Sequence, residues 1–259
     1  MTGCFTLRRE QLRFDVVTTD RLLEGPDETL REAIEHLVGA AFPTMSEPDR
    51  SSYVNDFFTK PGHNLTRKGI LFRTKDNGLV AVAIWDQGAI EYHRQTMETV
   101  YLISFMVQPE YQGFGLGQFI AAKVLTELAP DLLLVTCDQS ASLYAWINLP
   151  GKGLVKDFEV YPRLLDHKEI MFLPLTDIDL VVRAFRQIYL GVADGRAQSI
   201  DGAINNLTVR MVRKNLHRPM FDFDPWERNG RRDEIASALG LTDRDGVLVV
   251  FKKLPSGHS

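Results

Sequence analysis

The sequence is poor in cysteine, in long apolar runs and in net charge of either sign. Its 259 residues include two cysteines, Cys4 and Cys137, too few for a disulfide framework or a cysteine-rich zinc site. No apolar run reaches the roughly 18 residues that a membrane helix needs, and the N-terminus lacks the apolar segment of a secretory signal. The net charge of −4 gives no reason to expect nucleic acid or an anionic membrane as partner. These absences predict a cytoplasmic protein that binds no metal, membrane or nucleic acid.

The composition is that of an ordinary globular protein, with 44% hydrophobic and 25% charged residues. Helices are expected at 28–42, 46–60, 116–128, 140–149, 177–192 and 234–241. Strands are expected at 12–17, 69–74, 79–85, 99–107, 131–137, 157–161, 169–173 and 246–254, while the segment 200–214 is ambiguous. A tight hairpin at Asn77-Gly78 joins two of these strands. The alternation predicts an α/β fold.

The segment 99–107 predicts a central strand, because apolar residues occupy both of its faces. A helix and then another buried strand follow it, which predicts a parallel pair of strands with a right-handed crossover. Pro109 and three alternate glycines, Gly113, Gly115 and Gly117, lie between the central strand and the helix. A glycine-rich turn before a helix is typical of a phosphate-binding site.

The glycine spacing excludes two common phosphate-binding motifs. A dinucleotide-binding fingerprint has its first glycine directly after the strand and a third glycine three residues after the second. Here five residues separate the strand from Gly113, and Gln118 stands where the third glycine belongs. A P-loop needs Gly-Lys and then Ser or Thr at the helix start, whereas this chain has Gly117-Gln118-Phe119.

The pattern that fits is Gln112-x-x-Gly115-x-Gly117, preceded by Val-x-Pro at 107–109. It resembles the pyrophosphate loop of the GNAT superfamily of acyl-CoA-dependent N-acyltransferases, and the expected element order over about residues 10–175 is also similar. The resemblance implies a GNAT fold, with a mixed central sheet splayed at the CoA site and backbone N–H groups binding the pyrophosphate. It implies acetyl-CoA as co-substrate and no metal. The implied cofactor-binding residues are Met106, Val107, Gln112, Gly113, Phe114, Gly115, Leu116 and Gly117.

The resemblance also implies a reaction in which an amine attacks the acyl thioester. A backbone N–H near Met106 or Val107 would stabilise the oxyanion. A tyrosine in the short helix after the next strand would protonate the departing thiolate, and Tyr144 fits that position, although Asn148 stands where the family pattern has glycine. The alternative for Tyr144 is a structural tyrosine in the core.

The sequence does not mark a general base. The central strand contains no carboxylate, and its interior polar side chains are Tyr101 and Ser104. Glu91, His93 and Glu98 precede the strand in an expected polar loop, and each could act through water or be a solvated loop residue. Catalysis without a base is the alternative for an amine of low pKa. The expected catalytic residues are Tyr144, Glu98 and Ser104.

Residues 1–175 form the expected GNAT core, and residues 176–259 form a C-terminal α+β extension. Three arrangements are open for the extension: packing on the core with 247–254 as an edge strand, a lid or dimer interface over the acceptor site, or a separate small domain. Packing on the core is favoured, with Phe221, Phe223 and Trp226 as buried anchors.

These features predict an N-acetyltransferase that transfers an acetyl or other short acyl group from acyl-CoA to a primary amine in a ternary complex. Its partners would be a CoA thioester and an amine, either a small molecule or a peptide, and a homodimer is left open. Cys137 is not expected to carry the acyl group, because burial raises the pKa of a thiol. Since the central strand lacks a carboxylate, a non-catalytic acyl-CoA sensor or scaffold is the alternative.

Overall fold

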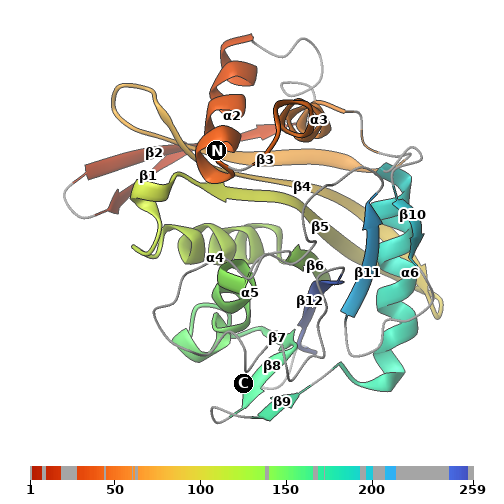
Figure 1. Cartoon of the computed structure of the whole chain (residues 1–259). Helices are drawn as coiled ribbons and strands as arrows, with labels where there is room; N and C mark the ends of the chain where they lie inside the picture. Colours follow the sequence, from red (N-terminus) through yellow and green to blue (C-terminus); the bar gives the residue numbers. More distant parts are fainter. Residues whose placement is uncertain are drawn as a thin grey trace. The chain divides into compact units, whose positions relative to one another are not determined.

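The computed structural model describes residues 2–7, 10–18, 28–43, 45–59, 61, 64–137, 140–165, 169–171, 173–192, 197–200, 208–213 and 245–255. The chain forms two compact units: unit 1 takes Met1–Gly88 and Leu102–Ile120, and unit 2 takes Ala89–Tyr101 and Ala121–Ser259. Both contain helices and strands, so the fold is mixed α/β, as predicted (Figure 1). The predicted division after residue 175 stays a prediction.

The sheet of unit 1 begins with strands that pair antiparallel in sequence order. They are β1 (Thr2–Leu7), β2 (Glu10–Thr18), β3 (Thr66–Arg73) and β4 (Leu79–Tyr92), and β5 (Gln95–Val107) follows beside β4. The hairpin predicted at Asn77 is confirmed: Asn77 has a φ of 71°, and the Thr74 N–H donates to the Gly78 carbonyl at 2.9 Å. Strand β1 was not predicted, because it depends on pairing with β2 and its own residues show no clear alternation.

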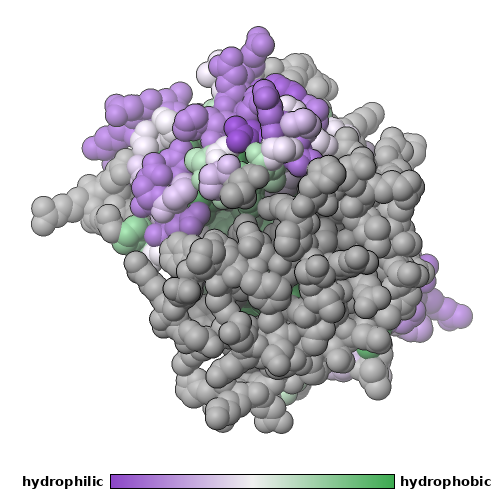
Figure 2. Space-filling view, viewed as in Figure 1, coloured by the Kyte–Doolittle hydropathy of each residue, from purple (hydrophilic) through white to green (hydrophobic). Residues whose placement is uncertain are grey.

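Two helices, α2 (Glu28–Ala41) and α3 (Glu47–Phe57), cover one face of this sheet. The buried residues of the shared core are Val17, Leu30, Ile34, Leu37, Val38, Met45, Val54, Phe57, Leu71, Leu79, Val82, Ile84 and Met106. The helix α3 begins at the predicted N-cap, since the Asp49 N–H donates to the Ser46 hydroxyl at 3.3 Å. The outward surface over α2 and α3 is mostly hydrophilic, as expected for helices with a single buried face (Figure 2).

An aromatic cluster lies on the opposite face of the unit 1 sheet. Phe72 follows Leu71 of the core along β3, so the two side chains point to opposite faces. The ring of Phe72 lies 5.4 Å from that of its cross-strand partner Phe14. Phe119, in the first half of α4 (Leu116–Leu128), lies 6.2 Å from Phe14 and 6.0 Å from Phe72. The start of α4 is therefore fixed to the sheet by aromatic packing.

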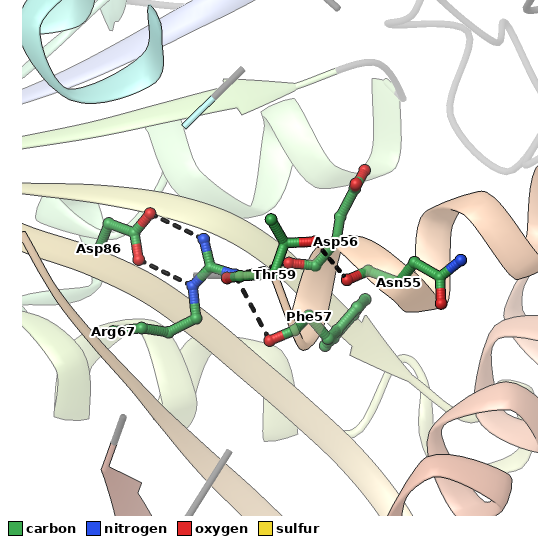
Figure 3. A network of polar contacts seen from close by, with 6 residues as sticks. All are labelled: Asn55, Asp56, Phe57, Thr59, Arg67 and Asp86. Carbon is green, nitrogen blue, oxygen red and sulfur yellow. Dashed lines mark hydrogen bonds and ion pairs between the residues drawn. The ribbon is translucent and has the colours of Figure 1, made fainter. Parts of the chain in front are cut away.

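A buried ion pair links β3, β4 and the end of α3 (Figure 3). Arg67 and Asp86 are cross-strand partners without exposed side-chain surface. The guanidinium donates to both carboxylate oxygens, from Nε at 2.8 Å and from Nη2 at 2.9 Å. Its Nη1 donates to the carbonyls of Asp56 at 2.6 Å, Phe57 at 3.4 Å and Thr59. Burial raises the pKa of the Asp86 carboxyl, against the opposing effect of the Arg67 hydrogen bonds and charge.

The connection between β4 and β5 differs from the prediction. Glu91 and Glu98, expected in a polar loop, belong to the strands themselves, which are joined by the two-residue turn His93-Arg94. His93 and Arg94 have φ values of 48° and 64°, the left-handed backbone of a tight hairpin turn. The sequence did not show this turn, because glycine and asparagine usually occupy such positions.

Unit 2 is built around β12 (Asp245–Lys253). One edge of β12 pairs with β6 (Leu132–Cys137), and the other pairs with β11 (Thr208–Arg213) and then with β7 (Phe158–Tyr161). The prediction of an edge strand at 247–254 is therefore wrong. The residues Val247, Leu248, Val249, Val250 and Phe251 are at most 1% exposed, since an unbroken apolar run suits a strand covered on both faces.

In unit 2, contacts between the beginning of β5 and the segment that contains β6 agree with the predicted parallel pair of strands. Tyr101 of β5 shares a hydrogen bond with Thr136 of β6 at 3.2 Å, and the Asp131 N–H donates to the Glu98 carbonyl at 2.8 Å. These contacts advance in the same direction along both strands, as expected for a parallel pair.

The remaining elements are α5 (Ser140–Ile147), a short 3-10 turn (Pro150–Lys152), α6 (Leu175–Val192), a hairpin of β8 (Arg163–Leu165) and β9 (Glu169–Met171), and β10 (Ala197–Ile200) beside β11.

Some predictions fall on residues that the structure does not describe. The helix expected at 234–241 and the anchors Phe221, Phe223 and Trp226 lie outside the described residues. The ambiguous segment 200–214 includes the end of β10 and all of β11.

Candidate functional site

The glycine-rich turn lies at the end of β5, in the part of that strand that belongs to unit 1. The residues of β5 from Leu102 to Val107 are buried or half-buried, as predicted. A single 3-10 turn, Pro109–Tyr111, follows the strand, and α4 begins at Leu116. The Phe119 N–H donates to the Gly115 carbonyl at 2.9 Å, so the helical hydrogen bonds begin directly at the last residue of the turn.

Two glutamines support this turn. The Gln112 Nε2 donates to the Val107 carbonyl at 2.8 Å, which ties the turn to the end of β5. The Gln108 backbone N–H and Nε2 donate to the carbonyls of Val80 at 2.9 Å and Leu79 at 2.8 Å, which ties the same segment to β4. Gln108 was not singled out from the sequence, and its place in the Val-x-Pro segment is the one signal that could have found it.

The three glycines meet two different requirements. Gly113 and Gly115 are exposed and have φ values of 79° and 83°, a backbone that is costly for any residue with a Cβ. A Cβ on either would meet no atom within 4 Å, so open space lies beside this backbone. A Cβ on Gly117 would lie 3.0 Å from the Phe105 ring. Gly117 therefore allows the close approach of α4 to β5.

This arrangement can bind an anion. The first N–H groups of a helix have no acceptor within the helix, and the helix dipole places about half a positive charge at that end. The open space beside Gly113 and Gly115 gives a phosphate access to the backbone. The turn can therefore hold a phosphate or pyrophosphate through backbone donors.

The predicted site residues of unit 1 gather around the end of β5. Met106 and Val107 are 2% and 7% exposed, and Leu116 is buried at the start of α4. Ser104 is 5% exposed, and its Oγ lies 2.8 Å from the hydroxyl oxygen of Tyr53 on α3. Sequence reasoning missed Tyr53, because the helical pattern does not show which strand a given side chain reaches.

The other two expected catalytic residues belong to unit 2. Glu98 is exposed near the start of β5, at the opposite end of that strand from Val107. Tyr144 lies on α5, and its side chain is outside those that the structure describes. The catalytic roles of Glu98, Ser104 and Tyr144 stay predictions.

Neither a metal-binding group nor a membrane-spanning helix occurs among the described residues. Within those ranges, no three His, Cys, Asp or Glu side chains gather into a group that could hold a metal ion. None of the helices in the described part of the chain is both long and apolar enough to cross a membrane.

Comparison with known proteins gives matches among solved structures. No protein-family model and no curated protein sequence matches the chain. One similar structure is a tandem GNAT protein from the clavulanic acid biosynthesis pathway, with 14% identity and a TM-score of 0.38 over 48% of this chain and 36% of that one. A GCN5-related N-acetyltransferase from Kribbella flavida has 14% identity and a TM-score of 0.34 over 52% of this chain and 32% of that one. The ribosomal-protein-S18-alanine N-acetyltransferase from Escherichia coli has 17% identity and a TM-score of 0.35 over 56% of this chain and 77% of that one.

The chain spans about a third of the length of the first two of these structures. The observed order of elements is the one expected from the sequence: two helices, three strands, the glycine turn, a helix, a buried strand and a short helix. The chain resembles the GNAT superfamily.

Proposed function

We propose that this chain is an acyl-CoA-dependent N-acyltransferase, which transfers an acetyl or other short acyl group to a primary amine by direct attack in a ternary complex. Acetyl-CoA is the proposed co-substrate, without a resident metal, and the proposed location is the cytoplasm. The observation that carries the proposal is the segment from Gln112 to Gly117, a supported, glycine-dependent turn that leads from a buried strand into the first residues of a helix.

The turn suits the pyrophosphate of CoA for physical reasons. A pyrophosphate needs several N–H donors on a backbone that no Cβ shields, and Gly113 and Gly115 provide such a backbone. The Val107 carbonyl accepts from Gln112 and keeps a second lone pair for the pantetheine arm. A backbone N–H near Met106 or Val107 is the proposed donor to the oxyanion.

The substitution Gly115→Ala tests the loop, and Gly153→Ala is its matched control. Gly153 has a φ of 67° and, like Gly115, open space where a Cβ would stand. Both substitutions place a Cβ on a left-handed backbone at a similar cost of about 1–2 kcal/mol. By calorimetry, Gly115→Ala should weaken CoA binding by about tenfold or more, whereas Gly153→Ala leaves it unchanged within about twofold. Equal CoA affinities in the two variants would contradict the proposal.

Activity is measured as release of free CoA from acetyl-CoA and other short acyl-CoAs with a panel of amines.

The second candidate function, a non-catalytic acyl-CoA sensor or scaffold, is favoured by the absence of a carboxylate in residues 99–107. Tight CoA binding without turnover on any amine would support the sensor. Tyr144→Phe separates the two functions further, since a lower turnover with intact CoA affinity supports the enzyme.

A further inference from the structure

We propose that the outer edge of β1 is an interface at which two copies of this chain pair antiparallel, about a two-fold axis at Cys4, into one continuous sheet. The surface is the strand Thr2–Leu7, and the partner is a second copy of the chain. This inference does not depend on the function proposed above, because no residue of the glycine-rich turn belongs to β1.

Strand β1 stands at the end of the strand order of its sheet. It pairs antiparallel with β2 over 6 residues, from Thr2 opposite Asp15 to Leu7 opposite Glu10, without a shift of register. Among the strands that the structure describes, β2 is its one partner. The outward N–H and C=O groups of such an edge are a template for a further strand.

The edge lacks the features that usually prevent such pairing. Soluble proteins protect edge strands with charged side chains, proline or a bulge. The sequence of β1, TGCFTL, contains no charged residue and no proline, and its regular register with β2 excludes a bulge. Thr2, Cys4 and Thr6 alternate along the strand and are exposed, so one face presents small uncharged side chains to solvent. This edge is therefore open to a further strand.

The order of residues in β1 makes a second copy the fitting occupant. With the two-fold axis at Cys4, each residue before Cys4 lies opposite the residue that is equally far after Cys4 in the second copy. Thr2 then lies opposite Thr6 of the second copy, and pairs of threonine across strands are favourable. Gly3, the smallest residue of the strand, lies opposite Phe5, the largest. This part of β1 is therefore complementary to itself, as an interface with two-fold symmetry requires.

The charges nearest to the edge allow this pairing. Arg13 of β2 lies opposite Cys4, and its guanidinium is 3.6 Å from the Asp15 carboxylate. In the proposed dimer both copies of β1 separate the two Arg13 residues, a distance of about 14 Å. This exceeds the Debye length of about 8 Å at physiological ionic strength, so their repulsion is screened. An uncharged strand beside a charge that is already paired suits an uncharged partner strand, such as its own copy.

The aromatic cluster holds β1 in position for this contact. Gly3 lies opposite Phe14, and a Cβ on Gly3 would stand 2.3 Å from an atom of the Phe14 ring. The ring therefore lies directly on the backbone of Gly3, and it also contacts Phe72 at 5.4 Å between centroids. An aromatic side chain that covers a glycine of an edge strand pins the register of that strand. The outer edge of β1 is thus formed before a partner arrives.

Cys4 allows the proposed axis to be tested chemically. Directly opposed residues of an antiparallel pair have Cα atoms about 4.5–5.5 Å apart, within the range of about 4.4–6.8 Å that a disulfide spans. Diamide takes two electrons and two protons from a pair of thiols as the S–S bond forms, so it traps paired copies as a covalent dimer. Cys137, the other cysteine of the sequence, is 1% exposed. A cross-link between copies therefore reports Cys4.

The experiment compares the full chain, without an N-terminal tag, with two doubly substituted chains. Thr2→Lys with Thr6→Lys puts like charges opposite each other on both sides of the axis, whereas Thr2→Lys with Thr6→Glu puts opposite charges there. Both positions are exposed, so both variants should fold, which circular dichroism checks. Sedimentation velocity in reducing buffer measures the dimer dissociation constant. The rate of cross-linking by diamide measures the pairing at Cys4, with Cys4→Ala as the control.

We expect the unchanged chain to form a reversible dimer, because a pair of short strands is a small contact beside the roughly 1,200 Å² of a stable interface. Diamide should convert this dimer to a covalent one, and Cys4→Ala should abolish the cross-link. The like-charge variant should have a dissociation constant about tenfold higher or more, and it should cross-link more slowly in proportion. The opposite-charge variant should stay within about threefold of the unchanged chain.

Three results would overturn the inference. The first is an unchanged chain that stays monomeric at every concentration. The second is a dimer with equal dissociation constants in the two charge variants, which would show that the copies meet at another surface. The third is an equal rate of cross-linking in the two charge variants, which would show that the Cys4 thiols meet by random collision.

Discussion

Helices α2 and α3 cover the same face of one sheet, but different interactions hold them there. The buried residues of α2 are Leu30, Ile34, Leu37 and Val38, a continuous apolar stripe. The helix α3 buries Val54 and Phe57 and depends in addition on polar contacts. Arg67 of the sheet donates to the carbonyls at its end, and Tyr53 reaches Ser104 of the central strand.

The difference matters because the two kinds of contact constrain a helix differently. Apolar packing depends on area and tolerates small shifts, whereas a buried hydrogen bond is lost when its geometry changes. The guanidinium of Arg67 also places a positive charge at the negative end of the dipole of α3. We therefore expect α3 to have one well-defined position on the sheet, and this position sets the Tyr53 hydroxyl beside Ser104.

The largest expected effect comes from breaking the ion pair. Arg67→Met leaves Asp86 buried without its partner and should lower the free energy of unfolding by about 3–5 kcal/mol. Urea denaturation measures the total loss. Hydrogen exchange should show that the amides of α3 lose more protection than those of α2, because the lost bonds cap α3.

The control for this prediction removes both charges. Arg67→Met with Asp86→Leu leaves no uncompensated buried charge, so it should recover most of the stability that the single substitution loses. The carbonyls of Asp56 and Phe57 stay without the guanidinium in the double variant, so the protection of α3 should recover less than the global stability. A double variant that is no more stable than Arg67→Met would show that the charge pair is not the main contribution.

The apolar helix should respond in the opposite way. Ile34 of α2 is fully buried, so Ile34→Ala should cost about 2–5 kcal/mol through lost burial and a cavity. The amides of α2 should lose more protection than those of α3. Glu32→Ala on the exposed side of the same helix is the control and should change stability by about 0.5 kcal/mol or less. A loss of protection shared equally by the two helices would remove the distinction between them.

The hydroxyl pair of Tyr53 and Ser104 contributes less to stability than to position. Tyr53→Phe keeps the ring contacts with Phe42 and Phe57 and removes the bond to Ser104, so it should cost about 1 kcal/mol. Adding Ser104→Ala should cost little more, since it removes the hydroxyl that the first substitution leaves without this partner. Urea denaturation of the two variants measures both values, and a second loss as large as the first would show that Ser104 has another stabilising role.

The same contrast explains what the sequence could predict. The stripe of α2, the hairpin at Asn77, the two-sided strand ending at Val107 and the Gln-x-x-Gly-x-Gly turn all depend on residues close in sequence. Each was predicted, and the structure contains each of these elements. The sequence pattern and the observed backbone show that the turn is able to hold an anion. Its role as an anion-binding site stays a prediction.

The features that were missed depend on contacts between distant segments. Arg67 stands in the strand sequence TRKGILFR, where charges are typical of a solvated edge, and only the register with Asp86 shows that it is buried. The interior place of β12 depends on pairing with β6, more than 100 residues earlier in the chain. The contact of Tyr53 with Ser104 joins residues 51 positions apart. Local periodicity contains no information on such pairs.

The smallest expected effect concerns the beginning of α3, where the polar contact is exposed. The Asp49 N–H donates to the Ser46 hydroxyl at 3.3 Å, a long bond, and Ser46 is open to water. Ser46→Ala should therefore cost about 0.5 kcal/mol, the low end of the range for N-cap substitutions. Ser46→Asn keeps an accepting oxygen and should leave stability unchanged, as measured by urea denaturation. A loss near that of Tyr53→Phe would mean that the exposed cap holds α3 as firmly as the Tyr53–Ser104 hydroxyl pair does, and it would weaken the case that buried polar contacts set the position of this helix.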